Sequence, residues 1–183
     1  IIQPVFAANA SVGGSQYAFA IISVIIGVFI NAILLEVGHI LGGLIGKYRI
    51  HSVNIFGFCF HKKSGKTHFA FRMFDGLTGE TKFLPKSEKS NPRPATLLPV
   101  LLYLIELVAA IILYALISTN VDVDLVWLSI GAIIVASIGG MMTLYNIVPF
   151  KLDAITDGYR LTLFAKKINI VAYNELMLAE NGD

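Results

Sequence analysis

Glu36 and His39 stand three residues apart in the stretch ILLEVGHILGG, which is otherwise apolar. On a helix this spacing places both side chains on one face. A carboxylate beside an imidazole can move protons, and an imidazole nitrogen can also bind zinc. The stretch is close to the H-E-x-x-H pattern, in which two histidines bind zinc and the glutamate is the general base. Leu35 stands at the position of the first histidine, so the stretch offers one such histidine rather than two.

A second group of polar residues follows far along the chain, in YNIVPFKLDAITDGYRL. Its members are Asn146, Pro149, Asp153, Asp157 and Gly158. Proline lacks the N–H that continues a helix, so the chain must turn near Pro149. Such a turn can direct a carboxylate back toward Glu36 and His39. The sequence therefore predicts one polar site assembled from two distant segments.

The composition is that of a membrane protein. Hydrophobic residues make up 56% of the 183 residues and charged residues only 14%, against about 25% charged in a typical soluble domain. Three apolar runs each reach the ~20 residues with which a helix crosses ~30 Å of hydrocarbon. We expect one integral membrane domain, residues 1–183, with spans at about 17–45, 96–118 and 125–145, an inserted segment at 46–95, and a motif and tail at 146–183.

The Lys and Arg residues predict how these spans are oriented. All 14 fall in two blocks, ten between Lys47 and Arg93 and four between Lys151 and Lys167. Cytoplasmic loops carry such an excess of Lys and Arg. We therefore expect a multi-pass protein of the cell membrane with an extracytoplasmic N-terminus and a cytoplasmic C-terminus. The lipid bilayer is an expected partner and nucleic acid is not.

The inserted segment has strand character in its first part. SVNIFGFCFHKK and THFAFRM are rich in β-branched and aromatic residues, with KKSGK between them. This pattern predicts a β-hairpin that turns near Ser64 and Gly65. The glycines and prolines from Gly76 to Pro94 then predict an irregular approach to the second span. The expected fold is an all-α membrane protein of three transmembrane helices, with a cytosolic β-hairpin between the first and second.

Small residues recur at every fourth position in two of the spans. Such spacing lets helices approach closely in lipid, where packing drives their association. The first span has Gly38, Gly42 and Gly46, and the third has Ala132, Ala136 and Gly140. We therefore expect the Glu36–His39 region to lie close to the third span.

With both motifs in view, the sequence resembles the site-2 protease family of intramembrane zinc metalloproteases. LEVGHILGG matches the first family motif at Glu36 and His39, and NIVPF…TDGYR matches the second, N-x-x-P…D-G, at Asn146 and Asp157. The resemblance implies that His39 and Asp157 are zinc ligands and that Glu36 activates a zinc-bound water. It also implies that Asn146 forms a hydrogen bond near the substrate. The spacing to Asp157 is longer than in the commonest family motif, so Asp153 stays a rival ligand.

Leu35 departs from the family pattern, because leucine has no lone pair and a catalytic zinc site needs three protein ligands. Three interpretations stay open. The chain is an inactivated protease that keeps the fold and binds substrate, or Glu36 becomes a ligand in a Glu-x-x-His pair, or another histidine completes the site. The candidates for that histidine are His51, His61 and His68. We favour the first interpretation, with zinc absent or weakly bound and without ordinary proteolytic turnover.

The function expected from this resemblance is that of an intramembrane metalloendopeptidase. It would cleave, or in the Leu35 form only bind, a transmembrane or membrane-bound peptide near the cytosolic face, to which the hairpin could offer an edge strand. The alternative is a non-enzymatic subunit or binding partner, and the chain could form homo- or hetero-oligomers. Glu106 lies in the middle of the second span. We expect its carboxyl, protonated or hydrogen-bonded, to hold a neighbouring helix or a partner rather than to act in catalysis.

Overall fold

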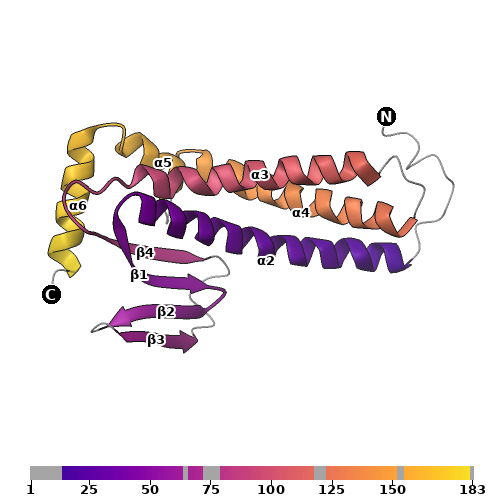
Figure 1. Ribbon diagram of the computed structural model, residues 1–183, viewed down its shortest axis with the longest axis horizontal. Helices are drawn as coiled ribbons and strands as arrows, with labels where there is room; N and C mark the ends of the chain where they lie inside the picture. Colours follow the sequence, from indigo (N-terminus) through magenta and orange to yellow (C-terminus); the bar gives the residue numbers. More distant parts are fainter. Residues whose placement is uncertain (1–13, 64–65, 72–78, 118–122, 152–154, 182–183) are drawn as a thin grey trace.

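Three long helices lie side by side in the computed structural model, and a small sheet and two shorter helices gather at one end of them (Figure 1). The structure describes residues 14–63, 66–71, 79–117, 123–151 and 155–181. The long helices are α2 (Gly14–Ile45), α3 (Arg93–Ile117) and α4 (Val123–Ile147). The shorter helices are α5 (Asp157–Leu163) and α6 (Lys167–Asn181).

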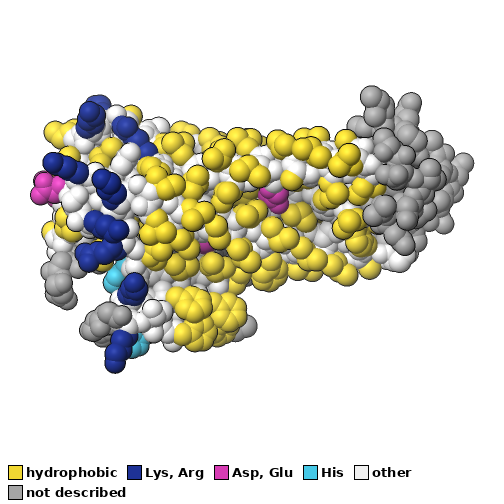
Figure 2. Space-filling model, in the orientation of Figure 1, with side chains coloured by type: hydrophobic (Ala, Val, Ile, Leu, Met, Phe, Trp, Pro, Cys, Tyr) yellow, Lys and Arg dark blue, Asp and Glu magenta, His cyan; other side chains and the backbone are white. Residues whose placement is uncertain are grey.

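The three long helices are long and apolar enough to cross a membrane, as the sequence predicts. α2 has 32 residues and α3 has 25, and 25 residues at about 1.5 Å each exceed the ~30 Å hydrocarbon core. The stretch of α4 that meets the same criterion is Trp127–Ile147. Figure 2 shows a nearly continuous apolar surface along these helices, whereas Lys and Arg gather at the end that carries α5 and α6.

The glycine stripe of α2 lies against α3. A Cβ on Gly38 would lie 2.6 Å from Cα of Pro99, and a Cβ on Gly42 would meet the backbone of Pro94. Gly38 and Gly42 therefore pack on α3 rather than on the third span. The start of α3 presents backbone atoms at these points, and only a residue without a side chain leaves room for them. The Glu36–His39 region does lie near the end of the third span, as predicted, because His39 and Asn146 of α4 both contact Asp157.

The third long helix, α4, reaches α2 through other glycines. A Cβ on Gly27 would lie 3.3 Å from Cα of Val135, and a Cβ on Gly131 would lie 3.1 Å from the ring of Phe19. Gly140, which the spacing pattern included, has nothing within 4 Å of its Cβ position. Close packing of the first and third spans therefore exists at Gly27 and Gly131, whereas Gly140 makes no close contact.

The segment between α2 and α3 forms a four-stranded antiparallel sheet in the order β3-β2-β1-β4. Its strands are β1 (Tyr48–Ile55), β2 (Phe58–Lys63), β3 (Lys66–Phe71) and β4 (Glu80–Pro85). The predicted turn near residues 64–65 does separate two paired strands, since Lys63 pairs with Lys66. The prediction of one hairpin was wrong, because SVNIFGFCFHKK divides at Phe56 and Gly57, whose φ values are 51° and 82°. Two positive values in a row are those of a type I′ turn.

The fourth strand lies where the sequence predicted an irregular approach, and it joins the sheet to the helices. β4 pairs with β1 and lies so close to α2 that a Cβ on Gly43 would meet the ring of Phe83. On α6, Asn174 accepts a hydrogen bond from the hydroxyl of Tyr48 and donates one of 2.7 Å to the carbonyl of Ser90. The sheet is therefore held by α2 and by α6.

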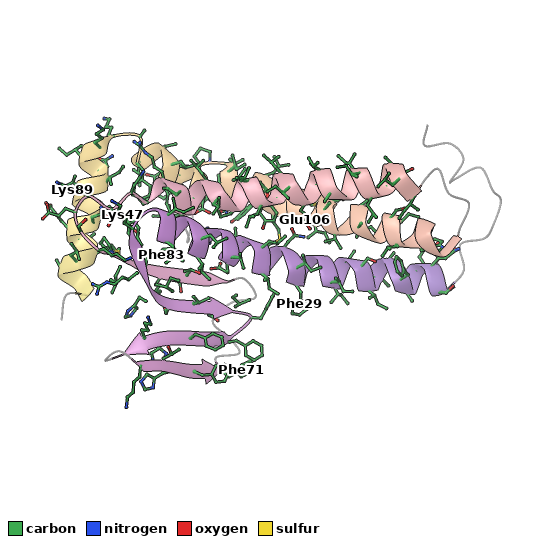
Figure 3. The ribbon with its side chains drawn as sticks, viewed as in Figure 1. Phe29, Lys47, Phe71, Phe83, Lys89 and Glu106 are labelled. Atoms are coloured by element: carbon green, nitrogen blue, oxygen red, sulfur yellow. The ribbon has the colours of Figure 1, made fainter. Side chains whose placement is uncertain are left out.

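The two strands farthest from the long helices, β2 and β3, are apolar at one end and basic at the other. Four exposed phenylalanines pack on one another: Phe58, Phe60, Phe69 and Phe71. Figure 3 shows Phe71 at the end of the sheet that points toward the middle of the long helices. Lys62 and Lys66 lie at the opposite end of the same strands, on the side where Lys and Arg gather in Figure 2.

Candidate functional site

Glu36 and His39 lie on the part of α2 that faces β4 and the end of α4. The side chain of Glu36 is 1% exposed and that of His39 is 14% exposed. Nδ1 of His39 lies 3.6 Å from Oε1 of Glu36, which is a distance for an ion pair rather than for a hydrogen bond. A buried carboxylate needs partners of this kind, because an uncompensated charge away from water is costly.

β4 covers the carboxylate of Glu36. The hydroxyl of Thr81 donates to Oε2 of Glu36, and a Cβ on Gly79 would meet the carboxylate itself. Sequence reasoning missed both residues because it treated this segment as irregular. The signal that could have found them is the period-two alternation in ETKFLP, in which Thr81 and Phe83 are less exposed than Glu80 and Lys82.

The turn after α4 is held by Thr156, the N-cap of α5. Its hydroxyl donates to the carbonyl of Val148 at 2.7 Å and accepts from the backbone N–H of Tyr159 at 3.4 Å. The cap satisfies a backbone N–H that the first turn of a helix leaves without a partner. The chain reverses through Pro149 and places Asp157, the first residue of α5, beside the end of α4.

Gly158 allows α5 to begin against the backbone of α4. A Cβ at this position would overlap the carbonyl of Ile147 and would lie 3.1 Å from the carbonyl carbon of Val148. Asp157 and Gly158 therefore have different structural roles. Asp157 provides the carboxylate, and Gly158 provides the close approach that brings this carboxylate to the site.

The structure brings His39, Asn146 and Asp157 together. Nε2 of His39 is 2.8 Å from Oδ2 of Asp157, and the amide of Asn146 donates to the same oxygen at 2.9 Å. Oδ1 of Asn146 accepts from the backbone N–H of Asp157 at 3.3 Å. Asn146 therefore fixes the direction of the Asp157 carboxylate, and its role beside a substrate stays a prediction. Asp153, the rival ligand, lies outside the described residues.

Glu36, His39 and Asp157 form a row, with one carboxylate at each nitrogen of the imidazole. A protonated imidazole carries an N–H on both nitrogens, so it can face a carboxylate on both sides. Nη1 of Arg160 lies 3.6 Å from Oδ1 of Asp157 and brings a positive charge to this carboxylate. The chemistry that this arrangement supports is the sharing of a proton between two acids through one histidine. We call these three residues the Glu36–His39–Asp157 row.

A catalytic zinc ion needs three protein donors around one centre and a fourth, open position. His39 and Asp157 supply two donors, which are hydrogen-bonded to each other. Leu35 supplies none, and Glu36 lies at the other ring nitrogen, so it cannot share an ion bound at Nε2. Among the described residues, no group of three or more His, Cys, Asp and Glu side chains is arranged to hold a metal ion. The described side chains at the site therefore do not fit a catalytic zinc ion.

The other histidines of the chain do not supply the missing third zinc donor. His61 and His68 stack on each other in β2 and β3, with ring centroids 5.4 Å apart. These two strands form the side of the sheet away from β1 and β4, the strands that contact α2. His51 belongs to β1, and among the described residues it joins no group of three side chains that could hold a metal ion. The part of the chain that the structure describes therefore gives no support to a displaced histidine ligand.

Comparison with known proteins adds no further guide to the site. No protein-family model matches the chain, and neither a curated protein nor a solved structure matches it.

Proposed function

We propose that the chain is a multi-pass membrane protein that binds a transmembrane or membrane-associated peptide at the Glu36–His39–Asp157 row, and that with Leu35 it does not cleave this peptide. The observation that carries the proposal is the 2.8 Å contact between His39 and Asp157, which are 118 positions apart. It supports the resemblance to the site-2 protease family, because the resemblance places these two side chains at one site.

The proposed orientation has the row near the cytoplasmic face. Support comes from the Lys and Arg side chains at the end of the long helices that carries the sheet, α5 and α6 (Figure 2). The positive-inside rule assigns this end to the cytoplasm. A peptide would then reach the row from the bilayer, close to the inner headgroups.

We propose that the peptide lies along β4 as an added strand. β4 is an edge strand of the sheet, and its Thr81 contacts Glu36, so the edge begins beside the row. Strand addition uses main-chain hydrogen bonds and therefore requires a segment whose backbone groups are free. A transmembrane helix has satisfied its backbone groups internally, so the bound segment would be one that has unwound.

Lack of turnover follows in this proposal from the donor set at the row. Peptide-bond cleavage by this class of site needs a water activated by a metal ion and a general base. The described side chains supply two of the three donors, and Glu36 is engaged by Thr81 and His39. In this proposal His39 and Asp157 instead form hydrogen bonds with polar backbone groups of the peptide.

Site-specific photocrosslinking tests peptide binding. A photoreactive residue would replace Lys82, which is exposed on β4, and the matched control would carry it at Lys166, which is exposed beyond α5. The probe is a synthetic transmembrane peptide of about 20 residues with a Gly-Pro break near its cytoplasmic end. We expect capture at position 82 and not at position 166. Equal capture at both positions, or none at either, would reject strand addition at β4.

Restoring the missing ligand tests the relation to the protease family. Leu35→His should bind about one zinc ion per chain, because the third donor then lies one turn from His39. Leu34→His is the matched control, since Leu34 is equally half-buried but faces a different direction on α2. Zinc bound by the first variant and lost on adding Asp157→Asn supports the family geometry. Zinc binding by neither variant would leave the alternative, a non-enzymatic membrane subunit without this lineage.

A further inference from the structure

A second polar cluster lies deeper among the long helices, around Asn31. The side chain of Asn31 is fully buried, and its amide nitrogen donates two hydrogen bonds of 2.9 Å, to the carbonyls of Gly27 and Val135. These bonds fix the orientation of the amide, because only the nitrogen can donate. Oδ1 of Asn31 therefore points the other way, and it has no hydrogen-bond partner among the described residues.

The carboxyl group of Glu106 faces this oxygen. Both of its oxygens are shielded from solvent and have no hydrogen-bond partner in the described part of the chain. Oε2 of Glu106 and Oδ1 of Asn31 each lie less than 3.0 Å from the point that a Cβ on Gly139 would occupy. Figure 3 places Glu106 about halfway along α3, on the side toward α2. Residues from α2, α3 and α4 therefore meet at two oxygens that are both acceptors unless a proton lies between them.

Among the residues that the structure describes, the long helices around Glu106 carry no cation beside it that could compensate a carboxylate. α4 has no charged residue from Leu125 to Ile147, and α3 has none after Arg93 apart from Glu106 itself. On α2 the nearest charged group is Glu36, five residues beyond Asn31. The hydroxyl of Tyr103, one turn from Glu106, donates instead to the backbone carbonyl of Asn31 at 3.1 Å.

We propose that Glu106 and Asn31 form a proton-binding site, in which the carboxyl group of Glu106 keeps its proton at neutral pH and donates it to Oδ1 of Asn31. One proton satisfies both unpartnered oxygens and removes an uncompensated charge. Leaving them unsatisfied in an apolar interior would cost several kcal/mol. The site ties α3 to α2 and α4 about 7.5 Å along α2 from Glu36.

A hydrophobic carbodiimide tests the protonation state directly, with the full chain in lipid vesicles at neutral pH. The carboxylic acid adds across one N=C bond of the reagent: its oxygen bonds to carbon and its proton moves to nitrogen. The resulting O-acylisourea rearranges to a stable N-acylurea, and no group leaves. We expect mass spectrometry to find this adduct at Glu106, with a yield that stays constant between about pH 6 and about pH 8.

Exposed acids of the same chain serve as internal controls. Glu88 and Glu175 are exposed, so they lie in water rather than in the apolar surroundings that a hydrophobic carbodiimide enters, and they should remain unlabelled. Glu106→Gln should abolish the adduct and should leave the thermal midpoint close to that of the wild type, because the Gln amide also donates to Asn31. An unlabelled Glu106, a higher midpoint for Glu106→Gln, or labelling that Na⁺ suppresses at constant pH would overturn the proposal.

Packing around the site offers a readout that does not depend on labelling. Gly139→Ala would push a methyl group between Oδ1 of Asn31 and Oε2 of Glu106. It should lower the thermal midpoint, whereas Gly140→Ala, with nothing within 4 Å of its Cβ position, should not. Equal midpoints for the two variants would mean that the oxygens do not meet at Gly139, and would overturn the proposed site.

Discussion

Gly158→Ala is expected to destabilise the protein, although the same change usually stabilises a helix. Alanine is favoured over glycine by about 1 kcal/mol in a helix interior. At position 158 the added methyl group would overlap the carbonyl of Ile147. Because the obstacle is backbone rather than a flexible side chain, α5 must shift, and overpacking of this kind costs about 1–3 kcal/mol.

The shift also acts on the candidate site, because Asp157 directly precedes Gly158 on α5. A displacement of about 1 Å would break the 2.8 Å contact with His39, and losing a charge-assisted hydrogen bond costs about 1–3 kcal/mol. The two costs add to about 2–6 kcal/mol, and the preference for alanine offsets about 1 kcal/mol of this. We therefore expect the free energy of unfolding to fall by about 1–5 kcal/mol. Unfolding in detergent micelles, followed by circular dichroism during titration with a denaturing detergent, would measure it.

Gly140→Ala is the matched control for this prediction. Gly140 lies inside α4 and has nothing within 4 Å of its Cβ position. This variant should be more stable than the wild type by roughly 0.5–1 kcal/mol. If Gly158→Ala were stabilised to the same extent, α5 would not be packed against the backbone of α4. Gly158 would then not be the residue that brings the Asp157 carboxylate to His39.

Two further variants probe the polar contacts in the same assay. Tyr48→Phe should cost about 1–3 kcal/mol because Asn174 loses its donor. Burial raises the pKa of Tyr48, so the wild type should lose stability as pH rises above about 10 and the variant should lose less; parallel pH profiles would contradict this. Asn146→Leu should cost about 1–3 kcal/mol, because Asp157 loses two hydrogen bonds. Wild-type stability in Asn146→Leu would mean that Asn146 does not hold Asp157.

The long helices could be predicted from the sequence because hydropathy alone decides them. Each apolar run is long enough to cross a bilayer, and the charged segments mark where each run stops. The observed bounds differ from the predicted ones by a few residues, and α2 begins at Gly14 rather than near residue 17. Gly14, Ser15 and Gln16 continue the helix without adding to its apolar character.

The sheet was predicted only in part, because its first turn carries a weak local signal. Type I′ turns favour Asn-Gly or Asp-Gly, whereas this chain places Phe56 before Gly57 in the left-handed region. A bulky residue at positive φ is rare, so the run appeared continuous. Phe56 packs on Phe29 of α2 with ring centroids 4.4 Å apart, and this tertiary contact favours the conformation.

The candidate site was predictable where residue type carries the information. A histidine and acids in apolar surroundings were visible as unusual, and His39 and Asp157 do meet. The contact of Thr81 with Glu36, and that of Arg160 with Asp157, depend on how β4 and α5 fold back. The partner of the glycine stripe was also beyond the sequence, because helical spacing shows that a face packs closely but not on which neighbour.

The hydrogen bond between His39 and Asp157 joins two parts of the molecule that are held in place by different contacts. Asp157 is fixed to the end of α4 by Asn146, Thr156 and Gly158, whereas His39 belongs with α2 and β4. A peptide that binds between His39 and Asp157 must separate the two side chains and offer each of them a new hydrogen-bond partner. A bare peptide unit does so, since its N–H suits the acid and its C=O suits the protonated ring. A helical segment offers neither group, because its N–H and C=O groups are already paired. Selectivity would then depend on how readily the peptide loses its helical structure rather than on its particular side chains.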